Sequence, residues 1–347
     1  MKIQLVTQMW PSPANPDLGS FLVPLTREFE RRGHEVAVSA ISRRGGAPTK
    51  YASLVGKSVR TARSFRPDVV FAHFLFPAGV AGVAASLAGR APLVVMAHGT
   101  DVANLTEIRG IRPLTVRVVA RSAAVISNSR WLAERLAASI PAAAAKTEIA
   151  DCGIDLDAFH PADSAPARER LGWDGDGPAF LCVGSLIGRK NVIALADAFG
   201  RFGRGRLAFV GDGPLRPELE GRPGVRVIGR IPQSDVPEWV AACDVLCQPS
   251  LAEPFGQATL EGMAMERSVI ATANGGPPEF VPPEAGVLVD PDNTEELLAA
   301  LERTAAMPSP NHAAREAARA HDVRTEAGRM LTVLERVVAQ RAGRPAQ

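Results

Sequence analysis

The sequence predicts an α/β protein with two Rossmann-like, doubly wound parallel sheets. Short apolar runs alternate along the chain with Gly- or Pro-containing turns and segments of helical spacing. Most of these runs are continuously apolar, as in strands that helices bury on both faces. The length of 347 residues and a polar, turn-rich stretch at 163–178 then favour two joined halves over one continuous sheet.

The expected elements follow one another in order along both halves. Strands are expected at Ile3–Thr7, Glu35–Ala40, Asp68–Ala72, Leu93–Met96, Ala124–Ser127, Ala179–Val183, Leu207–Val210, Val225–Ile228, Val245–Gln248, Val269–Thr272 and Val287–Val289. Helices are expected at Phe21–Arg32, Thr49–Phe65, Arg130–Ala138, Thr294–Arg303 and from about Val323 to Gln340.

One stretch is long enough to cross a bilayer, because residues 69–89 carry no charged side chain. It also contains His73, Pro77 and three glycines. We therefore expect a buried strand at Val69–His73, a turn, and a small-residue helix at about Gly79–Leu87.

Composition excludes several classes of protein. Hydrophobic residues make up 46% and charged residues 22%, which argues against a disordered or fibrous chain. The formal net charge of +2 gives no support to a nucleic-acid partner. No C-x-x-C pair occurs, so the cysteines are expected in the core rather than in a zinc ribbon or a disulfide framework. The N-terminus is too short and polar for a signal peptide, which favours a cytoplasmic protein.

The strongest candidate site follows the expected strand Val245–Gln248. A helix that begins near Gln257 would place Glu253 in the preceding loop and Glu261 about one turn inside. The backbone N–H groups around Gly256 would then form an anion site at the helix N-terminus. A nucleoside diphosphate sugar matches this layout, with one carboxylate for sugar hydroxyls and the other for a ribose diol. A helix cap and a solvated carboxylate are the structural alternative.

Three further loops follow expected strands of the second half. The loop Val183–Asn191 carries Gly184 and two adjacent cations, of which Arg189 can grip phosphate oxygens bidentately and Lys190 acts as a compact charge. The loop with Gly211 resembles half of a nucleotide-binding turn. The stretch 274–279 offers glycines for close backbone approach, and a functional role of its Glu279 stays open.

In the first half, His98 follows the strand Leu93–Met96 and is expected to contact the transferred sugar or the acceptor. Asp101 is expected to orient His98 or to cap the next helix. His73 and Asn128, each at a strand end, are weaker acceptor-side candidates. Gly19 ends the first βα loop, where the backbone could approach a ligand. Ser129 is expected to be a helix N-cap.

These motifs together resemble glycosyltransferase family 4, a retaining family with the GT-B fold. The resemblance rests on VGSLIGRKN, GDGP, EPFGQATLEGMA and GGPPEFV in that order, and on HGTD, CGIDLDAFHP and the opening PSPANPDLGSFLVPLTREFERRGHEVAV. It covers nearly the whole chain. It implies an acceptor-binding domain at 1–155, completed by a returning helix at about 323–347. It also implies a nucleotide-sugar domain at 156–322 across a central cleft.

The resemblance also implies roles for individual residues. Arg189 and Lys190 would bind the diphosphate, Glu253 the sugar hydroxyls and Glu261 the ribose, with His98 near the reacting carbon. The other implied donor-binding residues are Gly19, Gly184, Gly211, Phe255, Gly256 and Gln257. Many relatives carry a Gly-Gly pair in the first loop, whereas only Gly19 stands here after a Pro-rich lead. The acceptor specificity of the family therefore cannot be carried over to this chain.

The implied reaction transfers a sugar from a UDP or GDP sugar to an acceptor hydroxyl with retention. Front-face attack would let the leaving phosphate take the acceptor proton, so neither a side-chain nucleophile nor a cofactor is expected. Three D-x-D sequences occur, at Asp155–Asp157, Asp174–Asp176 and Asp290–Asp292. We expect turns there and no metal site.

The segment 43–66 is basic and contains no acidic residue. Its cations are Arg43, Arg44, Lys50, Lys57, Arg60, Arg63 and Arg66. They surround one apolar stripe of the expected helix, which indicates either a solvated surface or docking on an anionic membrane. Docking would suit a lipid-linked acceptor and a peripheral position on the inner membrane face.

Two other functions fit the same fold. One is a GT-B sugar phosphorylase or nucleotide-sugar epimerase. Phosphorylases of this fold commonly hold pyridoxal phosphate on a lysine, and of the five lysines here Lys190 is already assigned to the diphosphate. The other is a non-catalytic nucleotide-sugar-binding subunit of a partner enzyme. A nicotinamide dehydrogenase is disfavoured because no G-x-G-x-x-G follows the first strand.

Overall fold

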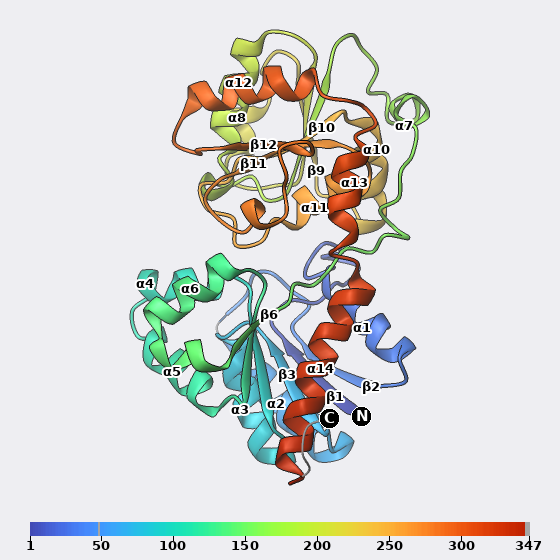
Figure 1. The fold of residues 1–347 in the computed structure, drawn as a ribbon. Coiled ribbons are helices and arrows are strands. Elements are labelled where there is room, and N and C mark those ends of the chain that lie inside the picture. The colour runs from blue at the N-terminus through green and yellow to red at the C-terminus, as the bar shows by residue number, and fades with distance from the viewer. Residues whose placement is uncertain (48, 344–347) are drawn as a thin grey trace. The chain divides into compact units, whose positions relative to one another are not determined.

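The computed structural model describes residues 1–47 and 49–343, and the chain divides into two compact units. Unit 1 contains Met1–Gly153 together with the chain from Val323 onward. Unit 2 contains Ile154–Asp322 and is therefore inserted into unit 1 along the sequence (Figure 1).

Unit 1 is built around a parallel six-stranded sheet with the strand order β2-β1-β3-β4-β5-β6. Its strands are β1 (Lys2–Thr7), β2 (Glu35–Ala40), β3 (Val69–His73), β4 (Leu93–Ala97), β5 (Ala124–Ser127) and β6 (Thr147–Ile149). Its helices are α1 (Leu22–Arg31), α2 (Thr49–Phe65), α3 (Ala78–Gly89), α4 (Thr100–Glu107), α5 (Ile111–Arg121), α6 (Arg130–Ser139) and α14 (Val323–Arg341).

Helices cover both faces of the unit 1 sheet, which explains its continuously apolar strands. On one face, α1 contributes Leu25 and Phe29 and α14 contributes Met330 and Leu334 to a single buried cluster. On the other face, α2, α3, α5 and α6 form a second cluster. The last helix of the chain is thus part of the core of the first unit.

Unit 2 repeats this design with the strand order β12-β11-β10-β7-β8-β9. Its strands are β7 (Ala179–Val183), β8 (Arg206–Val210), β9 (Val225–Gly229), β10 (Val245–Gln248), β11 (Ser268–Thr272) and β12 (Gly286–Val289). Its helices are α7 (Ser164–Leu171), α8 (Val192–Phe202), α9 (Arg216–Leu219), α10 (Val236–Ala242), α11 (Gln257–Ala264), α12 (Thr294–Ala305) and α13 (His312–Arg319).

Each sheet has a point where the strand order reverses, and ligands of such sheets bind outside the carboxyl ends of the strands at this point. In unit 2 the reversal lies between β7 and β10, because the chain runs from β7 to β9 on one side and from β10 to β12 on the other. In unit 1 it lies between β1 and β3. A ligand is therefore expected to contact the loops that follow these strands.

The predicted strands and helices are confirmed, but the prediction left out one strand and several helices, among them α5, α10 and α13. Strand β6 was not predicted, because it has three residues and its sequence TEI is neither apolar nor alternating. The interpretation of 163–178 as a break between the halves is wrong, because residues 164–171 form α7 within unit 2. Ala167 is buried there, and Arg168 pairs with Asp244 at 2.8 Å.

The stretch 69–89 folds as predicted, into strand β3, a turn and helix α3. Within residues 1–47 and 49–343, no helix combines the length and apolar character that crossing a membrane requires. The four cysteines, Cys152, Cys182, Cys243 and Cys247, are buried as expected.

Candidate functional site

The loops that follow β7 and β8 interlock at the point where the unit 2 sheet reverses. Gly211 has φ +146°, and a Cβ there would lie 1.8 Å from the carbonyl oxygen of Gly184. A Cβ on Gly213 would lie 2.3 Å from the carbonyl oxygen of Leu186. These glycines are required by backbone packing, and they hold the predicted phosphate loop in place.

The loops that follow β10 and β11 are joined in the same way. A Cβ on Gly275 would lie 1.9 Å from the carbonyl oxygen of Glu253, and the N–H of Glu253 donates to the carbonyl of Asn274 at 3.1 Å. The N–H of Leu251 donates to the carbonyl of Arg189 at 2.9 Å. The backbone of Glu253 is therefore fixed against both neighbouring loops.

Lys190 and Glu253 form an ion pair at this edge. Lys190 Nζ lies 2.5 Å from Glu253 Oε2, and the two side chains are only 16% and 11% exposed. Ser250 Oγ donates to the same carboxylate oxygen at 3.0 Å. The exposed Arg189 donates from its guanidinium to the carbonyl of Ala252 at 3.2 Å. The structure thus brings together three predicted donor-binding residues and adds Ser250.

The charges of this pair support each other. Burial alone would raise the pKa of Glu253, but the ammonium of Lys190, with smaller contributions from Arg189 and Ser250, holds the pKa below its usual value. The hydrogen bonds of Gln248 assign the orientation of its side-chain amide. The amide oxygen accepts from Lys190 Nζ at 2.9 Å, and the amide nitrogen donates to the Val183 carbonyl at 3.3 Å. Glu253 is therefore ionised at neutral pH.

Helix α11 begins where the sequence predicts, at Gln257 after Gly256. Gly256 has φ +108°, a conformation that favours glycine. The ring of Phe255 is buried and packs 5.2 Å from the ring of Phe280. The Phe255 ring therefore belongs to the core, so only the backbone of Phe255 is left to contact a donor, and its donor-binding role stays a prediction.

Glu261 lies one turn inside α11, as predicted, and is buried. Burial raises the pKa of Glu261 to about 8, against a smaller opposing effect of the hydrogen bond from Gln233. Gln233 Nε2 donates to Glu261 Oε1 at 3.2 Å. Glu261 therefore carries a proton at neutral pH, unlike Glu253, and the expected second carboxylate is a neutral acid here.

In unit 1, the ends of β3 and β4 bring two predicted residues together. His73 Nδ1 lies 3.0 Å from His98 Nε2, and the ring of Phe74 packs 4.4 Å from the ring of His98. Burial lowers the pKa of His98 to about 3, and burial and the neighbouring His98 lower that of His73 further. His73 is completely buried, so the structure gives no support to direct contact of His73 with an acceptor, and that role stays a prediction.

Asp101 fixes the backbone around His98 through both of its carboxylate oxygens, and its predicted place among the acceptor-side residues stays a prediction. One carboxylate oxygen accepts from the N–H of His98, Gly99 and Val102, and the other accepts from Leu75 N–H at 2.7 Å. Burial raises the pKa of Asp101, and these N–H donors counteract it. The predicted orienting role agrees with this geometry, and α4 begins at Thr100 beside it.

The remaining unit 1 candidates have internal packing roles or stay open. A Cβ on Gly19 would lie 2.6 Å from the carbonyl oxygen of Met9, so a packed chain segment already accounts for this glycine. Ser129 caps α6 by accepting from Leu132 N–H, as predicted. Asn128 is nearly buried, and its Oδ1 has no partner among the described residues.

One group of potential metal ligands lies within unit 1. Ligand atoms of His73, His98 and Cys152 lie within 4.8 Å of one another. The two imidazoles already share a hydrogen bond, and burial raises the pKa of the Cys152 thiol well above its usual value. The cluster is therefore a pair of hydrogen-bonded rings beside a neutral thiol. In the D-x-D sequences, Asp155 and Asp290 each accept from an N–H two residues ahead, as turns do.

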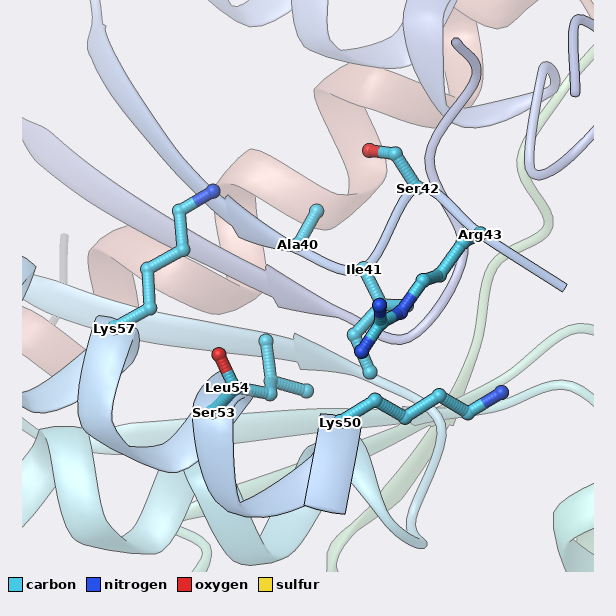
Figure 2. A pocket seen from close by; sticks show the side chains of 8 residues that line it. All are labelled: Ala40, Ile41, Ser42, Arg43, Lys50, Ser53, Leu54 and Lys57. Carbon is cyan, nitrogen blue, oxygen red and sulfur yellow. The ribbon is translucent and has the colours of Figure 1, made fainter. Parts of the chain in front are cut away.

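A basic pocket of about 390 Å³ opens where β2 ends beside α2. Figure 2 shows Arg43, Lys50 and Lys57 around a floor that includes Ile41 and Leu54. Lys50 Nζ donates to the carbonyl of Arg44 at 2.6 Å. The apolar stripe of α2 buries Leu54, Ser58 and Ala62, and the cations point outward as predicted.

Comparison with known families agrees with the resemblance seen in the sequence. Residues 177–306 match the model described as Glycosyl transferases group 1, and residues 18–158 match Glycosyltransferase Family 4. Together they span most of both units. The chain belongs to this glycosyltransferase family.

The glycosyltransferase is similar to curated and solved proteins. It is 28% identical over 258 residues to the putative teichuronic acid biosynthesis glycosyltransferase TuaC of Bacillus subtilis, which covers 73% of this chain and 65% of that protein. Sucrose-phosphate synthase of Thermosynechococcus elongatus superposes with a TM-score of 0.81 at 21% identity, covering 98% and 100% of the two chains. Anabaena HepE in complex with UDP-glucose superposes with a TM-score of 0.77 at 23% sequence identity, covering 96% of this chain and 99% of that chain. These likenesses confirm the predicted GT-B fold.

Proposed function

We propose that this glycosyltransferase moves a sugar from a UDP or GDP sugar to an acceptor hydroxyl, with retention at the anomeric carbon and without a metal ion. The acceptor is expected in cell-envelope or polysaccharide biosynthesis. The observation that carries the proposal is the ion pair of Lys190 and Glu253, held beside Arg189 at the reversal point of the unit 2 sheet.

The charges of this edge suit a diphosphate leaving group. Lys190 and Arg189 carry two positive charges against the single negative charge of Glu253. As the sugar–phosphate bond breaks, negative charge grows on the diphosphate, and cations placed beforehand stabilise it at little reorganisation cost. The N-terminus of α11 adds the partial positive charge of the helix dipole. These groups supply the positive charge that other transferases take from a metal.

The two glutamates fit different parts of the same donor. Glu253, ionised and fixed by the loop after β11, can accept hydrogen bonds from sugar hydroxyls. Glu261 carries a proton in the free protein, and a ribose diol that donates to it would favour the carboxylate instead. Binding of the nucleoside would then release a proton.

Unit 1 supplies the groups for the sugar and the acceptor. His98 is neutral and is positioned by Asp101 and Phe74, so it acts as a hydrogen-bonding group and not as a cation. No side-chain nucleophile is assigned. In front-face attack the leaving phosphate takes the proton of the acceptor hydroxyl.

The similar proteins support this choice of donor and pathway. The structure of HepE is a complex with UDP-glucose, and TuaC is named as a putative glycosyltransferase of teichuronic acid biosynthesis. Both observations belong to those proteins. They agree with the donor chemistry that the unit 2 edge favours.

The basic surface of α2 supports a peripheral position on an anionic membrane from the cytoplasmic side. Lys57, Arg60 and Arg63 are exposed on this helix, and the pocket beside them adds Arg43 and Lys50. Each cation near an anionic bilayer contributes about 1 kcal/mol of attraction. A lipid-linked acceptor would then meet the enzyme at the surface.

Thermal unfolding with UDP, GDP or ADP at equal concentrations tests the donor site. A ligand at about 100 times its Kd stabilises the folded protein by about 2.7 kcal/mol, so the preferred nucleotide will raise the midpoint most. No shift with any nucleotide would contradict the proposal. Release of free sugar from the matching donor, measured without acceptor, then separates an enzyme from a non-catalytic binding subunit.

A further inference from the structure

The environment of His73 is unusual for a histidine beside a candidate active site. Its side chain is completely buried, and its ring packs 4.4 Å from the ring of Phe71. Nδ1 is 3.0 Å from His98 Nε2, whereas Nε2 is buried with no hydrogen-bond partner in the described part of the chain. The two ring nitrogens of His73 therefore have very different surroundings.

Only two proton arrangements fit this pair. Both rings are neutral, so each carries one N–H, and one ring must donate to the other across the 3.0 Å contact. If His98 donates from Nε2, the proton of His73 lies on its own Nε2. If His73 donates from Nδ1, the proton of His98 lies on its own Nδ1.

Burial decides between the two arrangements. In the first, a buried N–H on His73 has no acceptor, and such orphaned donors are rare in proteins because they lose their full hydration. In the second, only an unused lone pair is buried, and under-satisfied acceptors are more common. The proton of His98 then lies on Nδ1, which is unpaired but not buried.

We propose that His73 is a positioning residue that holds His98 in the tautomer with its proton on Nδ1. His98 then offers an N–H donor to an oxygen of the bound ligand and has no free lone pair on that nitrogen. It cannot serve there as a general base. This inference rests on the proposed function, in which His98 contacts the donor sugar and the leaving phosphate takes the acceptor proton.

Three constraints act together on the His98 ring. Asp101 fixes its backbone N–H, Phe74 packs against its face, and His73 occupies its Nε2. The first two fix the place and plane of the ring. Only the third distinguishes one ring nitrogen from the other, so the donor direction depends on His73.

Nitrogen-15 NMR of the full chain, labelled at its six histidines, reads the tautomer directly. Loss of a signal in His98→Gln assigns His98. The expected result at neutral pH is a protonated Nδ1 and a bare Nε2 on His98. A protonated Nε2 on His98 overturns the inference, and this measurement needs no variant of His73.

Two variants of His73 test the positioning role. His73→Leu removes the donor, so both tautomers of His98 become populated and kcat falls about tenfold, with the KM for the donor within about twofold. His73→Gln keeps an N–H donor and restores most of both readouts. Phe71→Leu, which disturbs the packing of His73 without removing the donor, is the matched control. An unchanged tautomer of His98 in His73→Leu contradicts the proposal.

Nucleotide binding separates this inference from the proposed function. The residues proposed to bind the diphosphate and the ribose, Arg189, Lys190 and Glu261, lie in unit 2. The His73 variants are therefore expected to keep the nucleotide-induced rise in unfolding temperature. If no nucleotide stabilises the wild type, the proposed function fails, while the NMR result still decides the tautomer. If nucleotide binds and His98 carries its proton on Nε2, only the role of His73 is refuted.

Discussion

In unit 2, the carboxyl edge of the sheet presents paired charges, whereas the equivalent edge of unit 1 presents neutral rings. Glu253 stays ionised because its ion pair with Lys190 offsets the effect of burial on its pKa. In unit 1, His73 and His98 lose their protons to burial, and backbone N–H groups surround the carboxylate of Asp101. The same sheet architecture thus produces two different electrostatic environments.

This difference shows how one fold divides a transfer reaction. A charged edge recognises an anionic leaving group and stabilises its developing charge. A neutral edge can orient hydroxyl groups without competing for the diphosphate. Under the proposed function, the ions of unit 2 would stabilise the leaving group, and the hydrogen bonds of unit 1 would orient hydroxyl groups. Four experiments test this division.

The largest effect is expected for Lys190→Ala. It removes one placed cation, which lowers turnover by roughly 10²–10³. It also leaves Glu253 buried without its partner, which costs about 3–5 kcal/mol of unfolding free energy. Steady-state kinetics and chemical unfolding measure the two effects. Lys190→Ala with Glu253→Gln will recover stability but not turnover, and recovery of turnover would show that the charge has no catalytic role.

In unit 1, Asp101→Asn will destabilise the protein by about 2–3 kcal/mol, because an amide offers one acceptor oxygen where two carboxylate oxygens accept from backbone N–H groups. Turnover falls as His98 shifts, while nucleotide binding is unchanged. Glu107→Gln, an exposed position on the same helix, is the control. Lost nucleotide binding in Asp101→Asn would contradict the division between the units.

Glu261→Gln is expected to change the pH dependence of stability. The pKa of Glu261, about 8, lies above its ordinary 4.5, so folding favours the neutral acid. Its contribution is complete below pH 4.5 and is lost as the pH rises through 8. The amide variant will match the wild type at pH 4 and be up to about 5 kcal/mol more stable at pH 9, since one pKa unit corresponds to about 1.4 kcal/mol. The exposed Glu302→Gln should show no such difference between the two pH values.

The smallest effect concerns the basic surface of α2. The double variant Lys57→Glu with Arg60→Glu will weaken the free energy of binding to anionic vesicles by at least about 2 kcal/mol, since each cation contributes about 1 kcal/mol. Co-sedimentation with the vesicles measures this loss. Arg117→Glu with Arg121→Glu on α5 makes the same charge change at another exposed site. An equal loss of vesicle binding in both double variants would indicate a general charge effect and would contradict docking through α2.

The sequence was sufficient to predict features that depend on local patterns. Continuous apolar runs located the strands, and Gly256 before an apolar helix located the start of α11. Strand β6 escaped because its three residues pair at the sheet edge and carry no pattern. Helix α7 was not predicted because the polar, turn-rich composition of 163–178 was interpreted as a linker, although residues 164–171 include Ala, Arg, Glu and Leu, which favour helix.

Partners of the candidate residues were harder to predict, because they come from separate loops. Gln248 ends an apolar strand, and its polar side chain was the one available signal for a contact with Lys190. Gln233 lies in another βα unit from Glu261. The pairing of His73 with His98 depends on β3 and β4 being neighbours, which a strand list alone does not establish.

Unit 1 is built from two separate segments of the chain, which has a consequence for its folding during synthesis on the ribosome. The chain leaves unit 1 at Gly153 and returns at Val323, and Ile154 pairs with Asp322 where unit 2 begins and ends. Unit 2 is therefore complete before α14 has been made. Met330 and Leu334 cover one face of the unit 1 sheet. This face stays exposed until unit 2 and then α14 have been translated. The half that starts first is finished last, and its exposed apolar face is the part of the nascent chain that most needs a chaperone.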